Sequence, residues 1–426
     1  MQRVLSFQMA RGFGESSEFV TKRMCFSFLF SVGFLCLLCG FLLGRFASER
    51  SLEFRAEKKR LEFAGNGLEH MEHLQHLLFQ KLGEASYETD WTTSTVEGRD
   101  TAKISEMLSD LPLFHQIIKN GSFVLATSHG FREPDRFVIL SASGKGIGVA
   151  LELAKIFNHI QSEYGWIPRR TLIFCLFFGS VDICPTMIPN FVRHKVVAYI
   201  ALYDDNLRGN GNFIFAASNL IRSMILQDIT IIKKLNSSEN HDAFNVNNLA
   251  HRDILLPHLA LDISHAAFSF IKKNASMNSG SGNNAGFKLY HIPLAQLVGD
   301  IVWRLSESLA FHWDARYFNE TVVNVLETIN TSKTLDFKDD INKTIVQLTS
   351  AIQVLNQRID TTDGSKSLDL RILNDLLMDL DRVLLCPNKY ISSKSFRTLP
   401  QQSSDTLNYL NELLKCYKAA IQLLQE

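Results

Sequence analysis

The stretch Glu133-Pro-Asp-Arg-Phe-Val-Ile-Leu140 runs from a charged turn into an apolar strand. A helix pattern follows over Val149–Tyr164. The stretch Gly165-Trp-Ile-Pro-Arg-Arg-Thr-Leu-Ile-Phe174 is then a turn and a second apolar strand. Nearly continuous apolar strands that alternate with a helix are typical of a parallel sheet covered on both faces. This part of the sequence therefore predicts an α/β domain.

The same pattern extends along the chain. We predict strands at Arg136–Ser141, Thr171–Phe178 and Val196–Tyr203. From Leu294 onward the apolar periodicity is helical, and three helices in succession after Tyr317 indicate a helical bundle. The predicted helices are Leu294–Phe311, Asp336–Ile359, Leu368–Leu385 and Ser404–Leu424.

Three segments, in the same order, resemble the membrane-bound glutamate carboxypeptidase (NAALADase) and transferrin receptor family. The first is residues 133–182. The second, Ala295–Leu309, looks like the helix that leads out of the family's peptidase domain. The third, Leu370–Arg382 followed by Cys386-Pro387, looks like a helix of its dimerisation domain. The resemblance implies an α/β domain of the zinc-aminopeptidase type, residues 102–315, and an all-α dimerisation domain, residues 316–426.

The residues that hold zinc in active members of this family are absent here. Those members carry His-x-Asp after the first strand, where this chain has Ser143 and Lys145. They carry a Glu-Glu pair after the second strand, where this chain has Ser180 and Val181. The stretch that holds their next aspartate is missing, and the chain has no room for their apical domain. A hydrolytic zinc site needs several nitrogen or oxygen ligands and a carboxylate base. We therefore expect a degenerate peptidase-like domain without metal, cofactor or catalytic residues.

Two residues are weak metal candidates. Asp204 follows a predicted strand that ends in a metal-binding aspartate in active members. Tyr203 takes that place without a gap, whereas Asp204 or Asp205 takes it only with a one-residue shift. His291 fits better, without a gap, as part of the lead into the helix that contains Ala295 and Gln296. We interpret Asp204 as a solvated strand-end residue and His291 as structural.

A glycine-rich turn raises a competing hypothesis. Ser141-Ala-Ser-Gly-Lys-Gly-Ile-Gly148 follows a strand and opens a helix, as a dinucleotide-binding turn does. Ala142 stands where the first glycine belongs, and no acidic residue ends a second strand about 20 residues later. An NAD(P)-binding oxidoreductase is therefore only a remote alternative, because a tight turn explains the glycines equally well.

The region before the α/β domain predicts a membrane anchor. Met24–Gly44 is a run of 21 uncharged, mostly apolar residues, close to the ~20 that span a bilayer. We predict a type II signal anchor with a cytosolic tail, residues 1–23, and a stalk and linker, residues 45–101. The C-terminal part then lies at the cell surface or in the lumen of an endomembrane. All six N-glycosylation sequons follow the anchor, at Asn120, Asn236, Asn274, Asn319, Asn330 and Asn342.

Four cysteines lie in the predicted outer part. Cys175 with Cys184, or Cys386 with Cys416, could pair in an oxidising compartment, and sequence alone does not fix the connectivity. The position of Cys175 in an apolar strand favours a buried thiol.

These observations predict a catalytically inactive, peptidase-derived membrane glycoprotein that acts in binding or scaffolding. Broad apolar bands on Leu368–Leu385 and Ser404–Leu424 predict a homodimer through the C-terminal helices. An unknown protein ligand is expected. Formal net charge zero gives no reason to expect a nucleic acid. Metallocarboxypeptidase or dipeptidase activity, through unrecognised ligands or in a fuller isoform, stays as the alternative.

Overall fold

The computed structural model describes residues 27–38, 40–41, 68–85, 99–179, 183–207, 213–228, 263–270, 283–316, 335–362, 367–385 and 403–425. The chain divides into two compact units, Met1–Ala64 and Gly65–Glu426. Of the predicted anchor Met24–Gly44, residues 27–38 and 40–41 are described and are helical. Among all described residues, no helix combines the length and the apolar character needed to cross a membrane.

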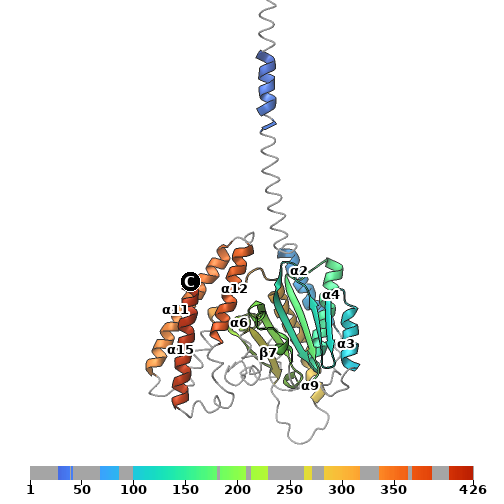
Figure 1. Ribbon diagram of the computed structural model, residues 1–426, viewed down its shortest axis with the longest axis vertical. Coiled ribbons are helices and arrows are strands. Elements are labelled where there is room, and N and C mark those ends of the chain that lie inside the picture. Colours follow the sequence, from blue (N-terminus) through green and yellow to red (C-terminus); the bar gives the residue numbers. More distant parts are fainter. Residues whose placement is uncertain are drawn as a thin grey trace, which may run out of the picture. The chain divides into compact units, whose positions relative to one another are not determined.

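A seven-stranded mixed sheet forms the centre of the second unit (Figure 1). Its order is β1-β2-β4-β3-β5-β7-β6. The central strands β4, β3, β5 and β7 are parallel to one another, whereas β1, β2 and β6 are antiparallel to their neighbours. This confirms the predicted α/β fold. The strands are β1 (Gln116–Asn120), β2 (Phe123–Ser128), β3 (Glu133–Ser143), β4 (Arg170–Phe177), β5 (Val196–Leu202), β6 (Phe213–Ala217) and β7 (His265–Phe270).

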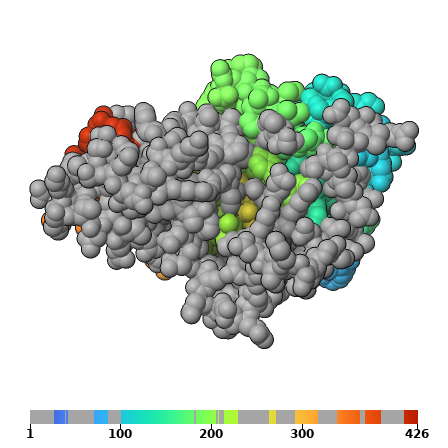
Figure 2. All heavy atoms as spheres, turned by 90° about the horizontal axis from the view of Figure 1, so that it is seen from below, coloured from blue at the N-terminus to red at the C-terminus, as the bar shows by residue number. Residues whose placement is uncertain are grey.

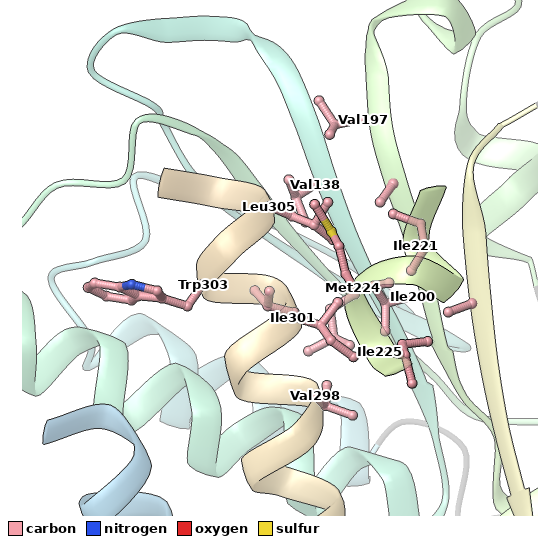
Figure 3. Packing of buried hydrophobic residues seen from close by; sticks show 14 of the residues in the cluster. Val138, Val197, Ile200, Ile221, Met224, Ile225, Val298, Ile301, Trp303 and Leu305 are labelled. Atoms are coloured by element: carbon pink, nitrogen blue, oxygen red, sulfur yellow. The ribbon is translucent and has the colours of Figure 1, made fainter. Parts of the chain in front are cut away.

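The sheet is covered on both faces because alternate residues of its strands point to opposite sides. On β3, Val138 and Leu140 enter the larger core, and Ile139 between them enters a smaller one. Helices α4 (Lys145–Tyr164) and α9 (Asn283–Glu307) pack over the larger core, where Val298 and Ile301 of α9 line up facing the sheet (Figure 3). The helix before the sheet, α3 (Arg99–Ser109), and β1 are the cyan region at the surface in Figure 2.

Helix α2 (Leu68–Glu84) corrects the prediction of a stalk over residues 45–101. Leu74, Leu78 and Leu82 are fully buried in the larger core. The Gln75 amide donates a hydrogen bond of 2.6 Å to Asp300 of α9. A charged sequence with an apolar stripe every three or four residues suits a packed amphipathic helix as well as an exposed one. The globular unit therefore begins before Ala102.

The C-terminal region is a helical bundle, as predicted. It consists of α11 (Leu335–Thr361), α12 (Ser367–Leu384) and α15 (Ser403–Gln425). Helix α12 packs against α6 (Asn219–Gln227), and Asp381 of α12 accepts a hydrogen bond from the Leu220 backbone at the start of α6. Ion pairs join α12 to the start of β3, between Arg136 and Asp375 and between Asp135 and Arg371.

Most of the apolar band on α12 is buried against other elements of the same chain. Leu373, Leu377 and Leu380 are buried, whereas Leu368 and Ile372 are 67% and 57% exposed. The part of this band that is free to face a second copy is therefore much narrower than the sequence suggested.

The cysteines of the described region are mostly oxidised. Cys175 of β4 forms a disulfide with Cys184, which begins the short 3-10 helix η1 (Cys184–Met187). This settles one of the two pairings left open by the sequence and corrects the prediction of a buried thiol at Cys175. Cys416 is also disulfide-bonded, and Cys386 lies outside the described residues.

Candidate functional site

The carboxyl ends of β3, β4 and β5 meet at one edge of the sheet because these strands are parallel. This is the edge where ligands bind in open α/β sheets. The strands end at Ser143, Phe177 and Leu202. Helix α4 starts directly after β3, so its N-terminus lies at the same edge, and Asp204 follows β5 there.

Asp204 joins the ends of β3 and β5 to α4. One carboxylate oxygen, Oδ1, accepts a hydrogen bond of 3.2 Å from the Lys145 backbone N–H in the first turn of α4. The Asp204 backbone N–H donates one of 3.2 Å to the Ser143 hydroxyl. All three residues are buried, and Asp204 is 1% exposed. The prediction of a solvated strand-end residue was therefore wrong. A carboxylate at a helix N-terminus is stabilised by the free N–H groups and the helix dipole.

The sequence contained a signal for this role. The residue at the N-cap of α4 is Gly144, which has no side chain to accept a hydrogen bond, so the cap must come from elsewhere in the chain. The strand that ends beside the helix supplies it through Asp204.

The glycine-rich turn is explained by close packing. Gly144 has φ of +49°, and a Cβ there would lie 2.4 Å from the Cβ of Asp204. A Cβ on Gly146 would lie 2.2 Å from the Leu202 carbonyl oxygen. Neither position tolerates a side chain. A dinucleotide pyrophosphate at this helix N-terminus would meet the Asp204 carboxylate, which disfavours the oxidoreductase alternative.

The structure brings some of the predicted site residues together. Ser143, Lys145 and Asp204 are neighbours, and His291 lies on α9. Ser180 and Val181 lie outside the described residues. Within the part of the chain that the structure describes, no three histidine, cysteine, aspartate or glutamate side chains gather as metal ligands would. Because two of the four substituted positions are not described, the absence of a metal site remains a prediction.

Aromatic rings occupy the neighbouring strand ends. The rings of Phe177 on β4 and Tyr203 after β5 make an edge-on contact with centroids 5.8 Å apart. Phe177 is 2% exposed, and Tyr203 is half-buried. Aromatic faces and edges are poor ligands for a hard cation, so these residues give the edge an apolar character.

The opposite edge of the sheet carries a buried charge network that the sequence did not predict. At the start of β3, Glu133 accepts hydrogen bonds from Arg169 Nε, at 2.7 Å, and from Arg170 Nε, at 2.9 Å. Arg170 is 1% exposed, donates to the Leu305 carbonyl of α9 and lies 4.6 Å from the centre of the Phe311 ring. Burial opposes ionisation of Glu133, but Arg170 and Arg169 together hold its pKa below the ordinary value.

Glu307, at the end of α9, adds a second carboxyl group to this network. It accepts a hydrogen bond of 2.9 Å from the Arg169 backbone N–H. Burial of the carboxyl group raises the pKa of Glu307 to about 8, although that backbone bond and both arginines favour the ionised form. The network therefore holds the N-terminal ends of β3 and β4 and the C-terminal end of α9 together.

Part of the chain is similar in sequence to known proteins. Transferrin receptor protein 2 from Mus musculus is 31% identical over 144 residues, which are 30% of this chain and 17% of the relative. Transferrin receptor protein 2 from Rattus norvegicus is 31% identical over 137 residues, which are 28% of this chain and 16% of the relative. The chain resembles the transferrin receptor and glutamate carboxypeptidase family. The predicted resemblance is thus confirmed, and the match spans less than a fifth of the length of these relatives.

Solved structures show weaker similarity. LapB from Legionella pneumophila is 12% identical, with 59% of this chain and 81% of that chain covered and a TM-score of 0.34. The zinc aminopeptidase BSAP from Bacillus subtilis is 10% identical, with 44% and 50% covered and a TM-score of 0.31. We base no inference on similarities at these TM-scores. No protein-family model matches the chain.

Two of the six predicted glycosylation sites lie in described parts of the chain. Asn120 ends β1 and Asn342 lies on α11, and both side chains are exposed. Asn236, Asn274, Asn319 and Asn330 lie outside the described residues.

Proposed function

We propose that this chain is a catalytically inactive, peptidase-derived membrane glycoprotein of type II topology that acts in binding or scaffolding. The observation that carries the proposal is the position of Asp204. Among the residues that the structure describes at the carboxyl edge of the sheet, Asp204 is the acidic candidate, and its carboxylate accepts a hydrogen bond from the start of α4. A metal ion would have to compete with that helix N-terminus for the same oxygen, and the nearby Ser143 and Lys145 supply no second carboxylate or imidazole.

Two observations support a location outside the cytosol. Cys175 and Cys184 form a disulfide, a bond that persists mainly in secreted proteins and in the lumen of the secretory pathway. The sequons at Asn120 and Asn342 present exposed asparagine side chains, as glycosylation requires. Both fit a chain anchored near its N-terminus with residues 45–426 on the luminal or extracellular side.

The activity test uses purified residues 45–426. We expect no cleavage of acidic dipeptides, and no change on adding a chelator, because the described residues at this edge supply no ligand set for a metal-bound water and no general base beside one. Hydrolysis that is abolished by a chelator and restored by zinc would overturn the proposal in favour of the metallocarboxypeptidase alternative.

The topology test uses the full chain in cultured cells. Endoglycosidase treatment should lower its apparent mass, and substituting Asn319, Asn330 and Asn342 by Gln should remove part of that shift. An unchanged mass, together with a C-terminus accessible to cytosolic protease, would reverse the orientation.

We further propose that the C-terminal helices form a homodimer. The support is the family resemblance and the exposed pair Leu368 and Ile372, which lie one helical turn apart on α12. Ile372→Glu should shift the sedimentation of residues 45–426 from dimer to monomer, because it places a charge in the interface. Val346→Glu on α11, where the valine is 69% exposed, is the matched control and should leave the dimer intact. A monomer before any substitution would contradict the proposal.

A further inference from the structure

Strand β1 leaves one edge of the sheet open. It is the last strand on its side and pairs only with β2 among the described strands. Four of its five residues are exposed, and the region forms part of the molecular surface (Figure 2). An edge strand presents unpaired backbone N–H and C=O groups, which are a template for pairing with another chain.

The composition of β1 makes this edge prone to association. The strand contains Ile117 and Ile118, two β-branched residues that favour extended pairing. Ile118 is 43% exposed. Lys119 is the one charged residue in the strand, and a lysine on an edge gives partial protection. An exposed strand of this kind needs a further cover.

A glycosylation sequon stands at the end of this strand. Asn120-Gly121-Ser122 starts at the last residue of β1 and continues through the turn into β2, where Asn120 pairs with Phe123. Asn120 and Gly121 are exposed, and apart from the glycine's own chain neighbours no atom lies within 4 Å of the position of a Cβ on Gly121. The turn next to the asparagine therefore faces open space. The sequon at Asn342 differs, because it lies within α11 and its Thr344 hydroxyl donates to the Asp340 carbonyl.

We propose that an N-linked glycan on Asn120 covers the open edge of β1 and prevents copies of this chain from pairing through that strand. A five-residue strand is about 17 Å long, so a bulky, solvated glycan attached at its end reaches along the whole edge. The inference rests on the luminal orientation proposed above, because that orientation is what allows the sequon to be modified.

The test compares variants of the full chain, expressed in cultured cells and extracted in mild detergent. Ser122→Ala removes the sequon and keeps the hydrogen bond from the Gly121 N–H to the Asn120 side chain. Ser122→Thr keeps the sequon, and Asn342→Gln removes a different one. Glycan occupancy is measured by mass spectrometry and the weight-average mass by light scattering.

Ser122→Ala should lose one glycan and raise the weight-average mass about two-fold or more, because at least one further copy joins through the free edge. Ser122→Thr and Asn342→Gln should keep the unmodified chain's state of association. Adding Ile118→Lys to Ser122→Ala should restore the original mass, since a charge on the edge opposes pairing.

Two results would overturn this inference and leave the proposed orientation intact. The first is that Asn120 carries no glycan while other sequons do. The second is that Ser122→Ala loses the glycan but keeps the original weight-average mass. A chain without glycan at any sequon would instead refute the luminal orientation, and the inference with it.

Discussion

Strands β3 and β4 are held together differently at their two ends. At the N-terminal end, Glu133 is buried between Arg169 and Arg170, and each arginine binds one of its carboxylate oxygens. At the C-terminal end, β3 and β4 finish with Ser143 and Phe177, neither of which is ionisable. Of the two ends of this strand pair, the one whose paired strand residues are charged is therefore the end opposite the ligand-binding edge of an α/β fold.

The two ends of the strands differ in the partners that their buried carboxylates have. A buried carboxylate is retained where fixed partners compensate for its lost hydration, as the two arginines do for Glu133. At the other end, a set of carboxylates would need metal ions as partners. The Asp204 carboxylate instead accepts a hydrogen bond from the N-terminus of α4, and its backbone N–H donates to the Ser143 hydroxyl. We infer that the N-terminal network is structural, and that Asp204 makes a smaller, local contribution to stability.

The largest expected effect comes from removing the Glu133 carboxylate. Glu133→Ala leaves two buried guanidinium groups without their shared carboxylate, and we expect a loss of about 3–5 kcal/mol in the free energy of unfolding. Urea denaturation of residues 45–426 measures it. Asp135→Ala, two residues along in a more exposed ion pair, is the control and should cost less than about 1 kcal/mol. Equal costs for the two substitutions would show that the buried network has no special role.

Glu307 makes the stability of this buried network depend on pH. Its folded-state pKa of about 8 lies above the ordinary value of 4.5, so the folded state holds a proton that the unfolded state releases. Its contribution to stability is complete below about pH 4.5 and is lost as the pH rises to about 8. Glu307→Gln keeps an acceptor for the Arg169 N–H but does not titrate.

Between pH 5 and pH 8 the variant should therefore lose less stability than the unmodified chain, by up to about 3–4 kcal/mol in the free energy of unfolding. Thermal unfolding in matched buffers measures the slope. Parallel pH profiles for the two proteins would show that Glu307 is already ionised in the folded state.

The smallest expected effect is at the C-terminal edge. Asp204→Ala should cost about 1–2 kcal/mol, because it removes the cap of α4 and leaves the Lys145 N–H without this acceptor. Asp204→Asn keeps an amide oxygen in the same place and should cost less. If Asp204→Asn were as destabilising as Asp204→Ala, the negative charge itself, rather than the hydrogen bond, would be what stabilises this edge.

The sequence predicted the long elements of this fold well. The strands around Val138, Thr171 and Val196 are apolar runs, and the last three helices have a clear helical period, so tertiary packing agrees with the local pattern. Strands β1, β2, β6 and β7 were missed, since they are short and their pairing depends on partners elsewhere in the chain. Helix α2 was predicted as a stalk because its buried stripe, Leu74 to Leu82, occurs within a highly charged sequence.

The candidate site was predictable only in part. Substitution of the metal-binding positions at Ser143 and Lys145 could be seen from the resemblance alone. The role of Asp204 could not, because it depends on β5 ending beside the start of α4, 59 residues away in the sequence from Lys145. The partnership of Glu133 with Arg169 and Arg170 likewise depends on the parallel pairing of β3 and β4.

The proposal that the carboxyl ends of the strands hold no zinc site can be tested directly. The measurement is zinc titration calorimetry of residues 45–426 at neutral pH, with Asp204→Asn measured in parallel. We expect no saturable binding at two ions per chain, and the same weak heats for both proteins, because the Asp204 carboxylate accepts a hydrogen bond from the start of α4 and no ligand set surrounds it among the described residues. Saturable binding of two zinc ions per chain that Asp204→Asn abolishes would contradict the account and identify Asp204 as a metal ligand.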